Sequence, residues 1–225
     1  TRFHKLFQGN YQPGTVVYTR PLFNNKCEDM AIDFSFSEEV EVARAGIRDF
    51  MHNTVKVRFK DLKKNKETTG DDWRELIKSL RKEAKSKGYW LPHMPAEVGG
   101  MGLGVTALAA VAAEAAKVPY GPYIINGHAP DEGNMHTLHH FATQYQRQKY
   151  LQPLLEGEVR SCFSMTEPEV AGSDPTLIQT AAVEDGDEWV INGHKWFTSG
   201  ARGASFAIVI ARTNPDAEIP QARNS

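Results

Sequence analysis

The sequence predicts an α+β fold, in which an N-terminal all-α helical domain is followed by an antiparallel β-barrel domain that is present only in part. Three observations support this prediction. Up to about residue 158, apolar side chains recur at the three- and four-residue spacing of amphipathic helices. Beyond that point, short β-rich runs alternate with turn signals such as Asn192-Gly193. The composition, 40% hydrophobic and 24% charged, is that of an ordinary globular protein rather than a disordered chain.

The first helix is expected over residues 37–55. Ser35-Phe36-Ser37-Glu38 matches a capping box. Apolar residues then follow at helical spacing: Val40, Ala43, Ile47, Phe50 and Met51. The charged segment 60–72 predicts a solvated loop, and Asp72 with Glu75 predicts the start of a second helix, which ends near Gly88. The buried stripe of this second helix is Trp73, Leu76, Ile77, Leu80 and Ala84.

Residues 89–104 are irregular and rich in proline and glycine, and an alanine-rich helix is expected directly after them. Gly102-Leu103-Gly104 followed by Ala107 matches the GxGxxA pattern of dinucleotide-binding folds. That pattern requires a hydrophobic strand before it, whereas Pro92 and Pro95 interrupt the preceding stretch. The small side chains of the helix instead suit close packing within a helical bundle, so a nicotinamide site is disfavoured.

Three histidines, His136, His139 and His140, share one helical face and could in principle bind a metal ion together. No nearby Cys, Asp or Glu completes a ligand set, so a polar helix face is the favoured interpretation and no metal site is expected. Cys27 and Cys162 are far apart and form no CxxC or Cys/His spacing, which fits a reducing compartment. Thr143-x-x-Gln146 predicts the cap of a further short helix.

Residues 1–29 are expected to form an extension or docking arm. Its basic side chains all precede the first acid, Glu28: Arg2, Lys5, Arg20 and Lys26. An acid-poor composition is one trait of organelle transit peptides, but Ser is absent and Pro13 and Pro21 oppose an amphipathic helix. Both interpretations stay open. The helical domain is expected over residues 30–160 and a truncated middle β domain over residues 161–225.

The net charge of the chain argues against nucleic acid as its partner. A formal net charge of -2 gives no overall field that would recruit nucleic acid. The longest apolar run, residues 105–118, is too short to cross about 30 Å of hydrocarbon, so no transmembrane segment is expected. We therefore expect a small molecule or another protein as the partner. Strands of the β unit are expected at residues 177–183, 189–192, 195–199 and 205–213.

The segment 163–174 shows neither helical nor strand periodicity, and its residue types suggest a ligand cradle. Ser164, Thr166 and Ser173 offer hydroxyl groups to a ligand. Gly172 allows the backbone to approach a ligand closely, and Pro168 stiffens the turn.

Two motifs give this cradle a family context. Met165-Thr166-Glu167-Pro168 leading to Gly172-Ser173-Asp174, and the segment Asn192-Gly193-His194-Lys195-Trp196-Phe197-Thr198-Ser199-Gly200, resemble the paired signatures of the acyl-CoA dehydrogenases. The resemblance extends from about residue 33 to residue 213 and includes a Pro-Gly-Gly loop at 95–100 and the connection 149–157. Residues 129–134 and 161–163, with the spacing of the first signature, are most similar to the branch that animals carry fused to a kinase-like domain.

The resemblance implies an α, β, α subunit that holds FAD between its domains. Such an enzyme oxidises an acyl-CoA thioester to its trans-2-enoyl form in fatty-acid β-oxidation and passes the electrons to an electron-transferring flavoprotein. It also implies a homo-oligomer in the mitochondrial matrix, with the peroxisome as the alternative compartment.

The resemblance further implies the residues that bind the cofactor: Phe163, Ser164, Met165, Thr166, Gly172, Ser173, Phe197, Thr198 and Ser199. Residues 163–166 would lie along the isoalloxazine ring, and Ser173 would reach the pyrophosphate and the bound substrate. Phe197 would stack on the dimethylbenzene side and Ser199 would donate toward N5. Many relatives have Trp and Thr at these last two positions, so both are mild departures that keep an aromatic face and a hydroxyl.

Glu167 and Glu169 are expected to be structural or solvated, because the general base of the family is a carboxylate in its C-terminal helical domain. The printed chain stops at Ser225, so we expect the rest of the barrel, the C-terminal four-helix domain and the catalytic base to be missing. No catalytic residue is assigned, and this stretch alone is expected to be inactive. The alternative is a non-catalytic structural or assembly subunit of a larger complex, such as a mitochondrial one.

Overall fold

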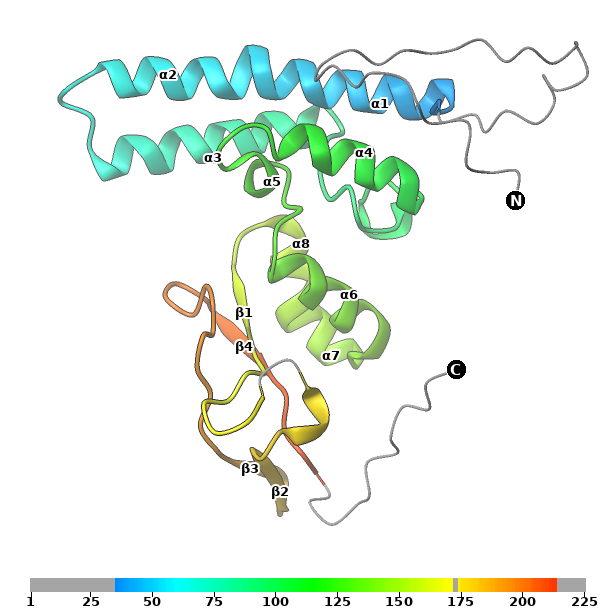
Figure 1. Ribbon diagram of the computed structural model, residues 1–225, viewed down its shortest axis with the longest axis vertical. Helices are drawn as coiled ribbons and strands as arrows, with labels where there is room; N and C mark the ends of the chain where they lie inside the picture. Colours follow the sequence, from blue (N-terminus) through cyan, green and yellow to red (C-terminus); the bar gives the residue numbers. More distant parts are fainter. Residues whose placement is uncertain (1–34, 172–173, 214–225) are drawn as a thin grey trace, which may run out of the picture. The chain divides into compact units, whose positions relative to one another are not determined.

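The computed structural model describes residues 35–171 and 174–213, and the arm predicted for residues 1–29 lies outside them. Helices occupy the described chain up to Glu156 and strands follow, which confirms the α+β fold class (Figure 1). Its helices are α1 (Glu38–Asp49), η2 (Phe50–Val55), α2 (Lys56–Lys64), α3 (Gly70–Ser86), η3 (Ala96–Val98), α4 (Val105–Ala115), α5 (Gly121–Ile124), α6 (Asp131–Phe141), α7 (Gln144–Gln146), η4 (Arg147–Leu151), α8 (Gln152–Glu156) and η5 (Pro175–Leu177). Its strands are β1 (Ser161–Ser164), β2 (Ala181–Asp185), β3 (Glu188–Asn192) and β4 (Phe206–Val209).

The first helical segment is longer than predicted. α1 continues through the π-helical turn η2 into α2, so the helix that was expected to end at residue 55 reaches Lys64. The prediction of a loop over residues 60–72 was wrong, because only residues 65–69 connect α2 to α3. Phe59 explains the difference: it is buried and its ring packs 5.5 Å from that of Trp73, so α2 gains an apolar contact that outweighs its charged sequence.

Helix caps were predicted with mixed success. Thr143 and Gln146 form the predicted capping box at the start of α7. A second capping box starts α3, but its N-cap is Thr69 rather than Asp72, whose carboxylate instead accepts from the Thr69 backbone N–H at 2.7 Å. The box predicted at residues 35–38 does not form, since the N-cap of α1 is Ser37 and its side chain makes no capping hydrogen bond. At the other end of α3, Gly88 has a positive φ of 75°, as its predicted stop requires.

The alanine-rich helix α4 is held against α1 by one buried carboxylate. Glu114 is 1% exposed and accepts hydrogen bonds from Arg44 Nε at 3.0 Å and Arg48 Nη2 at 2.8 Å, both on α1, and from Lys117 on its C-terminal side. The Arg48 bond, with those from Lys117 and Arg44, lowers the pKa of Glu114 to about 2. The small side chains of α4 allow this close approach.

Two apolar clusters form the core. The first joins α1, η2, α2, α3, α4 and α5, and its buried members are Ile47, Phe50, Met51, Val55, Phe59, Leu80, Ala84, Val111, Ala115, Val118, Ile124 and Ile125. The second joins the irregular segment 89–104 to α6, η4 and α8, and consists of Trp90, Leu91, Met94, Met135, Leu151, Leu154 and Leu155. Phe206 of β4 packs on the second cluster, which therefore anchors the β unit to the helices.

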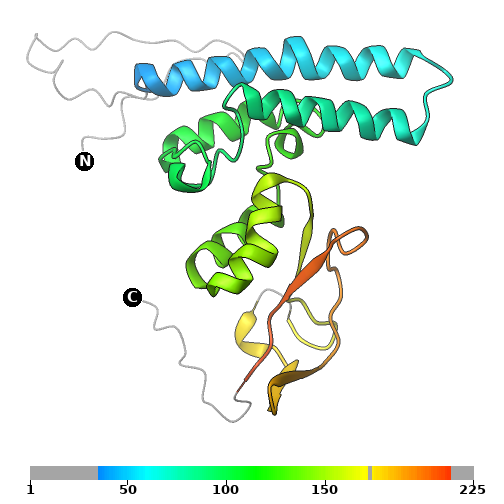
Figure 2. The same ribbon diagram turned by 180° about the vertical axis from the view of Figure 1, so that it is seen from behind.

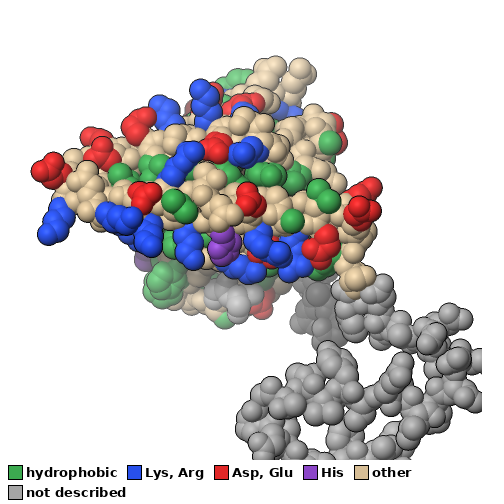
Figure 3. All heavy atoms as spheres, turned by 90° about the horizontal axis from the view of Figure 1, so that it is seen from above, with side chains coloured by type: hydrophobic (Ala, Val, Ile, Leu, Met, Phe, Trp, Pro, Cys, Tyr) green, Lys and Arg blue, Asp and Glu red, His purple; other side chains and the backbone are tan. Residues whose placement is uncertain are grey.

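The segment before α4 contains no strand among the described residues, only the short 3-10 helix η3 and irregular backbone. The dinucleotide-binding interpretation of Gly102 to Ala107 is therefore wrong. Along the described chain, no helix is both long and apolar enough to cross a bilayer. The face that carries α1 and α2 mixes basic and acidic side chains, in keeping with the small net charge (Figure 3).

The β unit differs from the predicted set of antiparallel strands. β2 pairs with β3 in an antiparallel hairpin, whereas β1 pairs with β4 in parallel, with Ser161 opposite Phe206 and Ser164 opposite Val209 (Figure 2). β1 was missed, because residues 163 and 164 were assigned to an irregular cradle. Residues 195–199 are not a strand, and residues 177–183 begin as the 3-10 turn η5 before β2 starts at residue 181. In the described residues the strands form no closed barrel.

The predicted helical face of His136, His139 and His140 lies on α6. Within residues 35–171 and 174–213, no group of three or more His, Cys, Asp or Glu side chains could hold a metal ion. His93 comes from the segment 89–104 and contacts this face, its ring centroid 5.4 Å from that of His136. His93 is 7% exposed, and neither ring nitrogen has a hydrogen-bond partner among the described residues. Burial, with the nearby rings of His136 and His128, lowers the pKa of His93 to about 4.

The lowered pKa of His93 predicts that the folded chain loses stability in acid. Its ordinary pKa is 6.5, so between pH 6.5 and about 4 the unfolded chain binds a proton that the folded chain does not. The free energy of unfolding should therefore fall by up to about 3 kcal/mol as pH drops through this window. Urea denaturation should show that His93→Leu flattens this dependence, whereas His194→Gln, at an exposed position, retains it. An unchanged slope in His93→Leu would contradict the assignment.

Candidate functional site

The first signature segment starts from a strand that is fixed to the helices by a buried polar network. Asp131 of α6 is 1% exposed and accepts hydrogen bonds from the Ser161 backbone N–H at 2.8 Å and the Ser161 hydroxyl at 2.6 Å. Asn134, one turn later, donates to Ser161 Oγ at 2.8 Å and to the Cys162 carbonyl at 3.2 Å. Burial raises the pKa of Asp131, but the bonds from His128 and Ser161 outweigh it and leave that pKa lowered. β1 is thereby held in one position on α6.

The turn after β1 is organised around Glu167, which is 2% exposed. Its carboxylate accepts from the backbone N–H groups of Gln179 at 2.7 Å and Thr180 at 2.9 Å, and from the Thr180 hydroxyl at 2.5 Å. Lys195 completes the set, with its Nζ 2.8 Å from Glu167 Oε1 and 2.8 Å from the Met165 carbonyl oxygen. Burial raises the pKa of Glu167, but these donors, Lys195 foremost, outweigh burial and bring it down to about 2.

The two signature segments therefore lie side by side. Besides the Lys195 contacts, the Trp196 backbone N–H donates to the Thr166 carbonyl at 3.1 Å. The hydroxyls of Ser164 and Thr198 lie 3.2 Å apart, within hydrogen-bond distance. Only the Trp196 N–H contributes a backbone group of the second segment to these cross-links, and the others are side-chain contacts, so residues 195–199 form no strand ladder, contrary to the prediction.

Two aromatic rings next to these cross-links face solvent. Trp196 is 42% exposed and Phe197 is 76% exposed, with ring centroids 4.4 Å apart. Phe197 has a positive φ of 49°, a conformation that is uncommon for a bulky residue. The Ser199 N–H closes this turn by donating to the Phe197 carbonyl at 2.7 Å. These two rings therefore lie outside the core, on a backbone that is fixed by local hydrogen bonds.

The predicted cofactor-binding residues are only partly brought together. Residues 163–166 and 197–199 meet across the cross-links described above. Gly172 and Ser173 lie outside the described residues, so their predicted contacts with pyrophosphate and substrate stay predictions. As expected, Glu167 is structural, and Glu169 is solvated, 3.0 Å from His194 at the surface.

Sequence reasoning missed three contributors to the site. Lys195 and Trp196 were quoted within the second signature but given no role, because their partners, Glu167 and Thr166, lie in the first signature. Asp131 was likewise quoted without a role. Its pairing with Ser161 spans 30 residues, and no local pattern in the sequence reports such a contact.

The available groups fit FAD. The Thr166 hydroxyl makes no hydrogen bond with the described residues, and the Ser199 hydroxyl makes only a long contact of 3.5 Å with the Phe197 carbonyl. With the rings of Trp196 and Phe197 they offer an apolar face beside free hydroxyl groups. A flat heteroaromatic ring with a polar edge, such as isoalloxazine, matches this chemistry.

The sequence matches two known family models. The description "Acyl-CoA dehydrogenase, N-terminal domain" matches residues 37–158, and "Acyl-CoA dehydrogenase, middle domain" matches residues 162–224. The chain belongs to the acyl-CoA dehydrogenase family. The family resemblance predicted from the two signatures is confirmed.

Individual relatives agree with this membership of the acyl-CoA dehydrogenases. The probable acyl-CoA dehydrogenase FadE2 of Mycobacterium tuberculosis is 38% identical over 195 residues, which cover 84% of this chain and 47% of FadE2. Human acyl-CoA dehydrogenase family member 11 is 41% identical over 151 residues, 65% of this chain and 19% of that protein. The chain thus spans about half of the FadE2 length and a smaller share of the human protein.

Solved structures share the fold. A Mycobacterium abscessus protein described as an acyl-CoA dehydrogenase superposes with a TM-score of 0.69 at 34% identity, over 82% of this chain and 48% of that one. An acyl-CoA dehydrogenase from Bacillus anthracis, solved in complex with FAD, superposes with a TM-score of 0.56 at 27% identity, over 79% of this chain and 30% of that one.

The buried Glu167–Lys195 pair predicts that replacing Glu167 lowers the free energy of unfolding far more than replacing Glu169 does. Glu167→Gln leaves the Lys195 ammonium, whose side chain is 12% exposed, without its buried counter-charge, and should lower the free energy of unfolding by about 3 kcal/mol. Glu169→Gln removes only a surface contact with His194 and should change it by less than about 0.5 kcal/mol. Urea denaturation at neutral pH measures both values.

The same pair predicts a pH dependence. Glu167 has a pKa of about 2 in the folded chain and an ordinary value of 4.5, so its contribution to stability is present above pH 4.5 and is lost as pH falls toward 2. Glu167→Gln should lack this part of the acid profile. Equal costs for the two variants at neutral pH, or equal acid profiles, would argue against the anchoring role.

Proposed function

We propose that this chain forms the flavin-side half of an FAD-dependent acyl-CoA dehydrogenase that acts in fatty-acid β-oxidation. The observation that carries the proposal is the cross-linking of two sequence-distant signature segments by Lys195 and Trp196, next to exposed aromatic rings and hydroxyls without a close partner. Nothing in the core of the fold requires these groups to face outward. A bound flavin ring gives them a partner.

In this proposal each residue has a defined role in binding. Phe163, Ser164 and Met165 lie along the isoalloxazine, and Thr166 donates to its polar edge. Phe197 and Trp196 cover the dimethylbenzene side, and the hydroxyl of Ser199 donates toward N5. Thr198 positions Ser164 through their hydroxyl contact of 3.2 Å. Gly172 and Ser173 are proposed to reach the pyrophosphate, with Ser173 also reaching the thioester substrate.

When bound, FAD supplies the acceptor for the hydride that leaves the substrate's β-carbon. The α-proton must go to a base, and neither described glutamate of the first signature can take it. Glu167 holds four hydrogen bonds and has a pKa of about 2, and Glu169 is solvated at the surface. We propose that a carboxylate outside the described residues is the base.

The wider context of the activity is also a proposal. It includes an acyl-CoA thioester as substrate, an electron-transferring flavoprotein as electron acceptor, a homo-oligomeric assembly and the mitochondrial matrix, with the peroxisome as the alternative. The FAD complex of the Bacillus anthracis relative supports the cofactor, and membership of the family supports the reaction class.

The reaction is tested on the protein expressed from its whole gene. The purified protein should show a flavin absorbance spectrum that bleaches when acyl-CoA is added without oxygen, because α-proton loss and hydride transfer reduce the bound flavin. A folded but colourless protein would contradict the proposal and favour the alternative of a non-catalytic assembly subunit.

The aromatic contact gives a sharper test of the site. Phe197→Ala removes an exposed ring from the proposed flavin face and should weaken flavin retention about fivefold, in line with about 1 kcal/mol for an aromatic pair. Trp189→Ala removes a ring of β3 that is 54% exposed and lies in neither signature contact, so it should retain flavin like the wild type. Flavin content per protein after gel filtration measures both, and equal loss in the two variants would argue against a flavin face at Phe197.

A further inference from the structure

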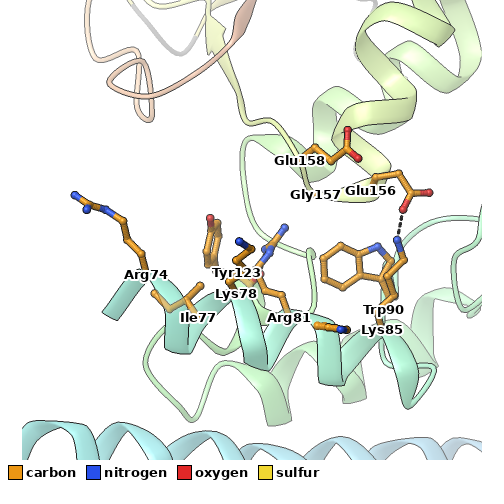
Figure 4. Close-up of a pocket in the computed structure, with 11 residues that line it drawn as sticks. Arg74, Ile77, Lys78, Arg81, Lys85, Trp90, Tyr123, Glu156, Gly157 and Glu158 are labelled. Atoms are coloured by element: carbon orange, nitrogen blue, oxygen red, sulfur yellow. Dashed lines mark hydrogen bonds and ion pairs between the residues drawn. The ribbon is translucent and has the colours of Figure 1, made fainter. Parts of the chain in front are cut away.

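A pocket lies away from the signature segments, between helix α3 and the turn that follows α8. Its volume is about 550 Å³, within the range of small-molecule sites. α3 lies along one side, residues 156–158 lie along the other, and Trp90 and Tyr123 stand between them (Figure 4). None of its lining residues comes from the first or second signature.

The side of the pocket formed by α3 is strongly basic. Five cations line it, and they recur at the spacing of a single helical face: Arg74, Lys78, Arg81, Lys82 and Lys85. Two carboxylates, Glu156 and Glu158, line the opposite side. The lining is therefore positive in balance, unlike the mixed face that carries α1 and α2 (Figure 3).

Most of these cations are weakly paired or unpaired. Arg74 pairs with Asp71 in an exposed contact, and Lys78 Nζ is 3.9 Å from Glu75. Such exposed pairs contribute little and are easily exchanged for another anion. Lys82 makes no ion pair with the described residues, and only Lys85 has a carboxylate of the pocket itself, Glu156.

Arg81 is the central group. Its guanidinium lies over the rings of Trp90, at 4.8 Å from the centroid, and of Tyr123, at 4.5 Å. It donates to the Tyr123 carbonyl and, at 3.2 Å, to Asn126 Oδ1. Within the described residues it has no carboxylate partner, although a half-buried guanidinium carries five donors and is normally paired with an anion.

The walls around Arg81 are rigidly held. Trp90 Nε1 donates to the Leu155 carbonyl at 2.8 Å, and Asn126 Nδ2 donates to the Leu154 carbonyl at 3.1 Å, so both residues are tied to α8. Gly157 has a positive φ of 74°, and a Cβ at this position would lie 2.3 Å from Arg81 Nη2 and 2.9 Å from Trp90. The glycine thus allows the turn to approach the guanidinium closely.

We propose that this pocket binds a small organic phosphate, with the phosphate group at Arg81 and Lys82 and an apolar body against the aromatic wall. A phosphomonoester carries about -1.5 to -2 charges and three acceptor oxygens, which suits several cations around one fork-shaped donor better than a single carboxylate does. Arginine also binds phosphate groups through paired N–H donors, which adds geometric specificity to the charge attraction.

The test uses phenyl phosphate as the probe and isothermal titration calorimetry on the purified protein expressed from its whole gene. Phenyl phosphate should bind at one site, more tightly than benzoate, and the affinity should fall with added sodium chloride. The double variant Lys78→Gln/Lys82→Gln should weaken binding about fivefold or more, because it removes two cations that are not needed for packing. Lys66→Gln, in the loop between α2 and α3, is the matched control and should bind like the wild type.

A second variant separates the charge of Arg81 from the planar shape of its guanidinium. Arg81→Lys retains the charge but loses the planar fork, so it should weaken phenyl phosphate binding relative to the Lys66→Gln control. The proposal is overturned if phenyl phosphate does not bind, if benzoate binds as well, or if the double variant binds like the control. Binding to vesicles that contain phosphatidic acid in the absence of phenyl phosphate binding would also overturn it, since the phosphate source would then be a lipid headgroup.

Discussion

The buried carboxylate of Glu167 is the constraint on which the candidate site depends. Three stretches of chain converge on it: the turn after β1, the start of the β2 segment at Thr180, and the second signature at Lys195. A charge removed from water must be fully paired and hydrogen-bonded, so these stretches have a single favourable arrangement. The close approach of the two signatures depends on this carboxylate, because Lys195 donates to both the Met165 carbonyl and the Glu167 carboxylate.

The same device recurs at the other junctions of the fold. Glu114 joins α4 to α1 through two arginines, and Asp131 joins α6 to β1 through Ser161. In each case the pKa is lowered, since the donors around the carboxylate outweigh its burial. Buried ion pairs add little net stability but are costly to break, so they act mainly to specify which surfaces meet. Apolar packing supplies the stabilisation, and the carboxylates select its geometry.

The structural use of the buried carboxylates limits which groups remain for a ligand or for catalysis. The acidic groups buried in the described chain are committed to structure, and the groups left for a ligand are hydroxyls, aromatic rings and cations. In the function that we propose, the exposed rings of Trp196 and Phe197 face the flavin, and proton removal needs a base from elsewhere. The basic pocket on α3 shows the converse arrangement, in which Arg81 is positioned by backbone carbonyls and aromatic rings and keeps donors free for an external anion.

The sequence by itself determined the α+β class, the family, the capping box at Thr143 and Gln146, and the end of α3 at Gly88, because each is encoded by residues that are close together in the chain. It could not determine the extension of the first helix to Lys64, which depends on the contact of Phe59 with Trp73. Nor could it determine the parallel pairing of β1 with β4 or the loss of the strand at residues 195–199. It likewise could not determine the contacts of Asp131 with Ser161 and of Glu167 with Lys195, which join residues 30 and 28 positions apart. A buried charge finds its partners in three dimensions, and only the tertiary structure decides which donors are near enough to satisfy it.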